Sequence, residues 1–200
     1  MVKFVYLASQ SPRRRQLLEQ LGVRYELLLP DADEDAEALE AAFENEAPAR
    51  YVKRVTGLKL DAASARLARR QLQPAPIVCS DTTVALGRTI YGKPDDAGHA
   101  ERMLSELSAK THRVLTAVQV QYGSRRFAVL STSRVSFEAM TGDQISRYAA
   151  TGEPLGKAGA YAIQGRVSMH ITRINGSYSG IMGLPLWETA ALLRAAGLDI

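Results

Sequence analysis

The sequence is poor in cysteine, which limits how the fold can be held together and where the protein can work. Cys79 is the only cysteine among 200 residues, so no intramolecular disulfide can form. Nothing therefore points to an oxidising compartment, and a cytoplasmic location is the simplest expectation. No other histidine or cysteine stands at zinc-ligand spacing from Cys79 or His112, so both are expected to pack inside strands.

Long apolar runs are also missing. No stretch approaches the ~20 residues that a membrane-spanning helix needs. The first eight residues are too short, and too interrupted by Lys3, to be the apolar core of a signal peptide. Aromatic residues make up only 6% of the chain, and no nucleic-acid-binding module is recognisable. We therefore expect neither a membrane partner nor a specific nucleic-acid partner.

The composition is otherwise that of an ordinary globular enzyme. Hydrophobic residues account for 46% and charged residues for 23% of the chain, and the formal net charge is +4. There is no internal repeat and no low-complexity linker, so residues 1–200 are expected to form a single domain. The positive charge favours an anionic partner without saying which one.

Strand and helix patterns alternate along the chain, which predicts an α/β fold. Two long alternating stretches, Thr111–Tyr122 and Arg125–Phe137, are joined at Gly123 and Ser124 and predict an antiparallel pair, so the sheet is expected to be of mixed direction. Further strands are expected at 2–8, 25–29, 76–81 and 169–174, a hairpin turn at 87–88, and helices at 12–21, 48–70, 141–150 and 185–196, with another helix opening at 94–95.

Three arginines stand in the first turn of the first expected helix, where cations are disfavoured. The free amides there make the helix end effectively positive, which costs each arginine roughly 0.3–1 kcal/mol. A bound polyphosphate would offset this repulsion, because amides, hydroxyls and guanidinium groups all donate to phosphate oxygens. The side chains that would form this cradle are Ser9, Ser11, Arg13, Arg14 and Arg15. The alternative is that the arginines extend into water and bind no ligand.

Asp81 is expected at the carboxyl end of an apolar central strand. Open α/β sheets place ligands at that edge, so its carboxylate would hold a divalent cation or accept a proton from an attacking water. The alternative is an aspartate that caps the next turn through the amides of Thr82 or Thr83. Lys93 precedes Pro94, which holds its backbone extended, and is a second candidate for contacting phosphate; plain solvation is its alternative.

Several motifs together resemble those of the Maf family of nucleoside triphosphate pyrophosphatases, also described as septum-formation inhibitors. They are, in chain order, SxSPRR followed by LL, SDTTV, GKP, LSxxTHxVxTAV, GEPxxKAGAYxIQG and INGSYxxxxGLPL. The motifs extend from Ser9 to Leu186, so the resemblance covers nearly the whole chain. It implies a mixed, partly antiparallel twisted sheet flanked by helices, with two lobes around a central cleft, as in inosine-triphosphatase-like enzymes.

The resemblance also implies an activity and partners. The expected reaction is hydrolysis of a nucleoside triphosphate to its monophosphate and pyrophosphate, with a divalent metal cation, Mg²⁺ or Mn²⁺, as cofactor. Such a reaction serves nucleotide-pool sanitation, with a link to the arrest of cell division, and the resemblance suggests a homodimer.

Roles for individual residues follow from the same resemblance. Asp81, the acid of the DT motif, is implied to be the general base and a metal ligand. Glu34 is implied to be the second metal ligand, although the neighbouring acids Asp31, Asp33 and Asp35 leave other alignments open. The family's basic cluster, together with the serine before it, gives the expected phosphate-binding residues: Ser9, Arg13, Arg14, Lys59 and Lys93.

Three positions argue for a subfamily. Members that act on dTTP and UTP resemble this chain in having Arg13, Thr82 and Gln164. Members that act on 7-methyl-GTP differ at these positions, and typically have glutamate at the third. A carboxylate suits a cationic methylated guanine, whereas a neutral amide can donate to and accept from a uracil or thymine edge. The resemblance therefore favours dTTP and UTP, with 7-methyl-GTP or another modified nucleotide as the alternative.

The chain departs from the family pattern in one region. Leu60 stands where alanine is common, and residues 62–76 are longer and more basic than usual, so Lys59 could instead extend its stem along a partly buried helix face. The pairs Arg69–Arg70 and Arg125–Arg126 also raise an alternative from another class, a basic nucleic-acid-binding regulator.

Overall fold

The computed structural model describes residues 3–32, 34 and 38–200. Its strands are β1 (Val5–Leu7), β2 (Tyr25–Leu27), β3 (Ile77–Leu86), β4 (Thr89–Tyr91), β5 (Thr111–Tyr122), β6 (Arg125–Phe137) and β7 (Ile171–Asn175). Its helices are α1 (Pro12–Gln20), α2 (Pro48–Arg69), α3 (Ala97–Leu107), α4 (Gly142–Ala149), α5 (Tyr178–Met182) and α6 (Leu186–Ala195), with 3₁₀ helices at Ala38–Glu40, Ala158–Ala160 and Arg166–His170.

The strands form one mixed sheet in the order β2-β1-β3-β5-β6-β7, with β4 paired to β3. β1 runs parallel to β2 and β3, and the other pairings are antiparallel. The long hairpin predicted from alternation is confirmed, since β5 and β6 pair from Thr111 opposite Ser136 to Tyr122 opposite Arg125. Gly123 in its turn has φ 59°, a conformation that glycine adopts without a side-chain clash. The predicted mixed α/β sheet flanked by helices is confirmed.

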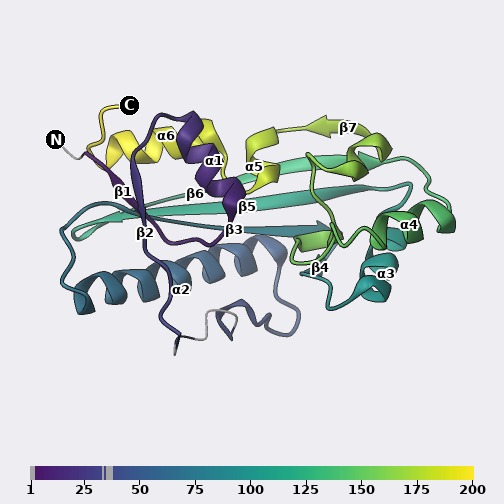
Figure 1. The fold of residues 1–200 in the computed structure, drawn as a ribbon, viewed down its shortest axis with the longest axis horizontal. Helices are drawn as coiled ribbons and strands as arrows, with labels where there is room; N and C mark the ends of the chain where they lie inside the picture. The colour runs from purple at the N-terminus through teal and green to yellow at the C-terminus, as the bar shows by residue number, and fades with distance from the viewer. Residues whose placement is uncertain (1–2, 33, 35–37) are drawn as a thin grey trace.

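Helices cover both faces of this sheet (Figure 1). α2 lies along one face, where it packs on β3 and β5 through Val52 and Val55. α1, α5 and α6 lie on the other face, with α5 and α6 against β5 and β6. The apolar residues at helical spacing in α2 explain this packing, because they form one stripe that can be buried against the sheet.

The edge of β3 is covered by different strands at its two ends. β1 pairs with it at Ile77 and Val78, and β4 pairs with it along Val84–Leu86. In the described part of the chain, neither strand pairs with residues 79–83 between them. Side chains from both faces of β3 can therefore reach the same opening in the sheet, since successive residues of a strand point to opposite faces.

The prediction that the central strand ends at Asp81 is wrong. β3 continues to Leu86, and Asp81 lies in its middle, opposite Ala117 of β5. The polar residues after Cys79 suggested a strand end, but antiparallel pairing with β5 carries the strand through them. Asp81 therefore projects from a central strand that is fixed along its length, not from a loop.

Other boundaries differ by a few residues. The helix predicted to open at 94–95 begins at Ala97, because Asp96 caps it by accepting a hydrogen bond from the His99 amide at 2.6 Å. The last predicted strand begins at Ile171, since a 3₁₀ helix occupies Arg166–His170. Val2, where the first strand was predicted to begin, and Asp33 and Asp35 lie outside the described residues.

Cys79 and His112 are both buried in the sheet, as predicted. Burial lowers the pKa of His112 to about 4, so its ring is neutral near pH 7 and shares a hydrogen bond with the Tyr161 hydroxyl at 2.7 Å. Among the described residues, no helix combines the length and the apolar character needed to cross a membrane.

Candidate active site

A cavity of about 730 Å³ opens where the edge of β3 is uncovered. Its walls come from the β1–α1 loop, the middle of β3, α2, the segment after β4, residues 156–164 and the end of α5. Most of the sequence-predicted site residues line it: Ser9, Ser11, Arg13, Arg14, Glu34, Lys59, Asp81, Thr82, Lys93 and Gln164. Arg15, also predicted for the phosphate cradle, is not among the described residues that line the cavity. Residues spread over most of the chain are thus brought to one place.

The start of α1 is built around Ser9 and Arg14. The Ser9 hydroxyl oxygen accepts hydrogen bonds from the Ser11 amide at 3.2 Å and from Arg14 Nη1 at 3.1 Å. Arg14 Nε donates to the Gly183 carbonyl at 3.0 Å. Ser11 is the N-cap residue but makes no side-chain capping hydrogen bond. The first turn of α1 is therefore tied to the end of α5, and Arg14 is held in a defined position.

Arg13 and Arg14 are cations in a poorly solvated place. Burial lowers the pKa of Arg13 below its usual value. Burial also lowers the pKa of Arg14, and Arg13 adds to that effect while the charge of Asp81 opposes it. Within the part of the chain that the structure describes, no carboxylate forms an ion pair with either arginine. An anion bound beside them would restore the solvation that both guanidinium groups lose.

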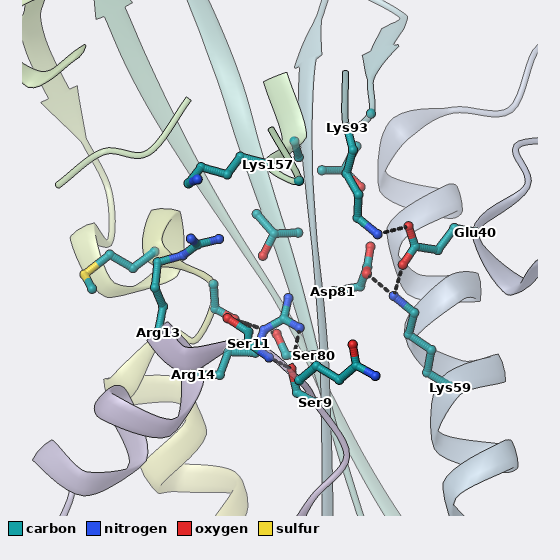
Figure 2. Close-up of a pocket in the computed structure, with 18 of the residues that line it drawn as sticks. Ser9, Ser11, Arg13, Arg14, Glu40, Lys59, Ser80, Asp81, Lys93 and Lys157 are labelled. Atoms are coloured by element: carbon teal, nitrogen blue, oxygen red, sulfur yellow. Dashed lines mark hydrogen bonds and ion pairs between the residues drawn. The ribbon is translucent and has the colours of Figure 1, made fainter. Parts of the chain in front are cut away.

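Across the cavity, two lysines and two carboxylates form a cluster (Figure 2). Lys59 Nζ, from α2, lies 2.6 Å from Asp81 Oδ1 and 2.7 Å from Glu40 Oε1. Lys93 Nζ lies 3.0 Å from Glu40 Oε2. Burial raises the pKa of Glu40, but the two ammonium groups lower it more, so the net pKa is below the usual value. Asp81 lines the cavity and is only 7% exposed, so its carboxylate is largely shielded from bulk water.

Glu34 lines the cavity but is engaged elsewhere. Its Oε1 accepts from Arg66 Nε at 3.1 Å and from Arg69 Nη2 at 2.6 Å, and its Oε2 accepts from Arg66 Nη2. The hydrogen bonds from Arg66 are the main reason that the pKa of Glu34 falls to about 2. Arg66 also donates to the Leu28 carbonyl at 2.9 Å, so it fixes the chain after β2 on α2.

Among the described charged residues that line the cavity, sequence reasoning missed three: Glu40, Arg66 and Lys157. Glu40 carried no signal, because nothing in the sequence shows which acid of the region folds back onto Lys59. Lys157 lies within the GEPxxKAGAY motif, so the motif could have indicated it. Lys157 donates to the Glu153 carbonyl and, at 3.4 Å, to that of Leu155. Burial lowers the pKa of Lys157, and the nearby positive charge of Arg13 lowers it further. Figure 2 shows Lys157 on the same side of the cavity as Arg13.

The chemistry of the acid pair fits a hard divalent cation. Asp81 and Glu40 converge on one ammonium nitrogen, and carboxylate oxygens are the ligands that Mg²⁺ and Mn²⁺ prefer. The described residues include no group of three or more acids, histidines or cysteines placed to hold a metal. This is compatible with Mg²⁺, which commonly binds one or two carboxylates together with substrate phosphates.

Comparison with known proteins bears on this site. A family model described as "Maf-like protein" matches residues 4–196. The chain is 71% identical, over 197 residues covering 98% of both chains, to a dTTP/UTP pyrophosphatase of Polaromonas sp. (strain JS666 / ATCC BAA-500). It is 67% identical over 200 residues, the full length of both chains, to a dTTP/UTP pyrophosphatase of Albidiferax ferrireducens.

Among solved structures, a nucleoside-triphosphatase, or dITP/XTP pyrophosphatase, of Mycobacterium abscessus matches 66% of this chain and 73% of its own with a TM-score of 0.39 and 13% identity. That likeness is too weak to bear on the fold or on the site.

Proposed function

Because the chain belongs to the Maf family, we propose that it hydrolyses dTTP and UTP to the monophosphate and pyrophosphate. Water adds to the α-phosphorus, the bond to the bridging oxygen of the β-phosphate breaks, and pyrophosphate leaves. The relatives' names support the substrate, and the two sides of the cavity support the chemistry. The enzyme is a hydrolase that acts on a phosphoric anhydride, in keeping with nucleotide-pool sanitation.

The observation that carries the proposal is the charge arrangement of the cavity. Arg13 and Arg14 are partly buried cations that form no ion pair with a carboxylate among the described residues, and they face a cluster that contains Asp81. A polyphosphate chain supplies the missing negative charge beside the arginines. A polyphosphate bound in this way would have its anhydride bond between the arginines and Asp81, which is the arrangement that hydrolysis requires.

Asp81 is proposed as the general base. Its Oδ1 accepts a hydrogen bond from Lys59, which leaves lone pairs of the carboxylate to take a proton from water. Lys59 keeps this carboxylate oriented toward the cavity. The proposed phosphate-binding residues stabilise the charge that develops on the leaving pyrophosphate. They are Ser9, Arg13, Arg14, Lys59 and Lys93.

A divalent cation, Mg²⁺ or Mn²⁺, is proposed as cofactor. Asp81 and Glu40 would hold it, and Glu34, which the family pattern indicates, would have to release Arg66 or Arg69 to contribute an oxygen. When bound, the cation supplies positive charge at the phosphate oxygens. In the protein itself, Lys59 and Lys93 together balance the charge of Asp81 and Glu40, which would otherwise repel the substrate.

Arg13, Thr82 and Gln164 are proposed to select the base, since all three line the cavity. Gln164 is exposed at its rim and carries a neutral amide, whose N–H can donate to a uracil or thymine carbonyl. A glutamate at this position would lack the donor.

Three of the four arginines that suggested nucleic-acid binding form ion pairs within the chain, and the fourth, Arg125, lies over the Phe127 ring. Arg69 Nη2 lies 2.6 Å from Glu34 Oε1, Arg70 pairs with Asp31, and Arg126 Nη2 lies 2.5 Å from Asp61 Oδ1. These guanidinium groups therefore already have carboxylate partners, and no observation favours that second function.

Pyrophosphate release from a nucleotide panel tests the proposal. The substrates are dTTP, UTP, CTP, 7-methyl-GTP, ATP and GTP, each with Mg²⁺ or Mn²⁺ and with chelator as the control. Release concentrated on dTTP and UTP and abolished by chelator is the expected result. Preference for 7-methyl-GTP would keep the reaction and overturn the choice of base, and no release from any nucleotide would overturn the proposed function.

The cytoplasmic location and the homodimer belong to the same proposal. The free, buried Cys79 supports the first, because nothing in the described chain needs an oxidising compartment. Size-exclusion chromatography with light scattering tests the second, with an expected mass of about twice the 21.8 kDa of one chain.

A further inference from the structure

Two threonines form a hydrogen-bonded pair behind the cavity. Thr82 of β3 and Thr116 of β5 lie opposite each other in the sheet, and their hydroxyl oxygens are 3.0 Å apart. Thr116 Oγ1 also lies 2.7 Å from the carbonyl oxygen of Gly180 in α5. Thr116 is 1% exposed, whereas Thr82 is partly exposed and lines the cavity. The pair thus links a buried carbonyl to the surface that a nucleotide would meet.

Counting protons fixes the direction of both hydrogen bonds. A carbonyl oxygen can only accept, so the single hydroxyl proton of Thr116 is given to Gly180. The proton between the two threonines must then come from Thr82. With its only proton directed inward, Thr82 presents lone pairs alone toward the cavity. At this point the cavity is an acceptor and cannot donate.

We propose that Thr116 is a positioning residue that fixes Thr82 as an acceptor, so that the site selects a base presenting an N–H at this point. The inference rests on the proposed function and adds a reason for its choice of base. Uracil and thymine carry a ring N3–H, which can donate to Thr82. The N3 of cytosine carries a lone pair instead, and two facing acceptors would leave both groups without a partner, which costs affinity.

The surroundings of α5 make this mechanism testable by substitution. The Gly183 carbonyl accepts from Arg14 Nε at 3.0 Å and from Ser80 Oγ at 2.8 Å, so α5 is tied to α1 and β3 independently of Thr116. A Cβ atom at Gly183 would lie 3.6 Å from Thr82 Oγ1, which shows how closely this end of α5 approaches Thr82. Replacing Thr116 by isosteric valine is therefore expected to leave α5 in place while freeing the hydroxyl of Thr82 to rotate.

The experiment compares kcat and KM for UTP and CTP in a set of variants. Thr116→Val should lower the ratio of kcat/KM for UTP over CTP at least tenfold, because a rotating Thr82 hydroxyl can donate to cytosine N3. Thr116→Ser keeps a hydroxyl and should retain the wild-type ratio. In a Thr82→Val background, Thr116→Val should change the ratio no further, since it acts through Thr82.

Thr189→Val is the matched control. Thr189 is also fully buried, its hydroxyl has no hydrogen-bond partner among the described residues, and it lies in α6 outside the cavity walls. This variant should keep the wild-type ratio, which separates selection from general loss of a buried hydroxyl.

The outcomes distinguish failure of the inference about Thr116 from failure of the proposed function. If the wild type hydrolyses UTP and Thr116→Val lowers the rates for UTP and CTP equally, or leaves both unchanged, the inference is overturned and the proposed function stands. A further change of the ratio in the Thr82→Val background would also overturn it. A wild type that releases pyrophosphate from no nucleotide would overturn the proposed function, and the inference with it.

Discussion

At the scale of the residue, Lys59 joins the acids of the site. Its ammonium group donates to Asp81 and Glu40 at 2.6 and 2.7 Å, and Lys93 supplies a second positive charge to Glu40. Neutralising carboxylates near a polyphosphate removes repulsion that would otherwise oppose binding. The two acids lie on different kinds of element, Asp81 on the central strand β3 and Glu40 on a short 3₁₀ helix.

Asp81→Asn is expected to lower kcat by about 10²–10⁴-fold, the usual contribution of a general base. The amide keeps the shape and can still accept from Lys59, so circular dichroism and the melting temperature should stay close to wild type. Asp61→Asn on the exposed side of α2 is the control and should keep wild-type turnover. Turnover by Asp81→Asn within threefold of wild type would remove Asp81 from the mechanism.

Glu40→Gln and Glu34→Gln separate the two candidates for the second metal ligand. We expect Glu40→Gln to weaken Mn²⁺ binding at least fivefold, because its carboxylate shares Lys59 with Asp81. Glu34→Gln should leave Mn²⁺ binding nearly unchanged, since Arg66 and Arg69 already occupy both oxygens. Isothermal titration of Mn²⁺ without nucleotide measures both, and the reverse order would favour Glu34.

At the scale of the element, the end of α2 holds the chain that follows β2. Arg66, Arg69 and Arg70 contact Asp31, Glu34 and the carbonyls of Leu28 and Leu29. The unusually basic stretch of the sequence therefore has a structural partner in the acidic run. This attachment forms one wall of the cavity, because Asp31, Glu34 and Arg66 all line it.

This attachment is expected to be lost in acid. The pKa of Glu34 falls from its ordinary 4.5 to about 2 in the folded protein, so the unfolded chain binds more protons between these values. The stabilisation by Glu34 is complete above pH 4.5 and declines as the pH falls through about 2. Urea unfolding at several pH values should show a difference between wild type and Glu34→Gln that shrinks over this interval. A difference that stays constant with pH would contradict this linkage.

The 3₁₀ helix Ala158–Ala160 is fitted closely to β3 at Gly159. Gly159 has φ 69°, and a Cβ atom there would lie 2.8 Å from three side-chain atoms of Val84. Gly156 has φ 71° with nothing within 4 Å of the same position. Both Gly→Ala variants pay about 1 kcal/mol for the left-handed backbone, and Gly159→Ala adds about 1–3 kcal/mol for the clash.

Urea unfolding of the two glycine variants therefore isolates the packing of this segment. Gly159→Ala should be the less stable, and it should also lose activity, because Ala158 and Val84 line the cavity. Equal stability of the two variants would show that the contact with Val84 does not constrain the segment.

At the scale of the whole molecule, the cavity draws on elements from both ends of the chain, so a bound polyphosphate should stabilise the fold. A nonhydrolysable UTP analogue at 100 times its dissociation constant adds about 2.7 kcal/mol. For a domain of this size, that corresponds to a rise of roughly 5–11 °C in melting temperature. Uridine, which lacks the phosphates, should have little effect, and an equal shift with uridine would contradict binding through Arg13 and Arg14.

The same experiment tests whether residues 1–200 unfold as one domain. The single sheet passes through strands from β1 to β7, and we expect one cooperative transition that the analogue shifts as a whole. Two separate transitions, with one unaffected by the analogue, would indicate two independently folding units.

The sequence by itself determined those features that depend on neighbours along the chain. Alternation predicted β5 and β6 to the residue, Pro12 marked the start of α1, and the order of the motifs indicated the family. The family resemblance, rather than a local pattern, assigned Asp81 and the arginines to one predicted site. Local sterics and hydrophobic periodicity encode the strands and the start of α1, because each arises within a few residues.

Only the tertiary structure decided which side chains meet. Asp81 reaches Lys59 across 22 residues, Thr82 reaches Thr116 across 34, and Thr116 reaches Gly180 across 64. Glu40 rather than Glu34 lies beside Lys59, and β3 continues through Asp81 where a strand end was predicted. Strand register and the packing of α2 and α5 on the sheet fix these contacts, and no local pattern carries the positions of groups that lie far apart along the chain.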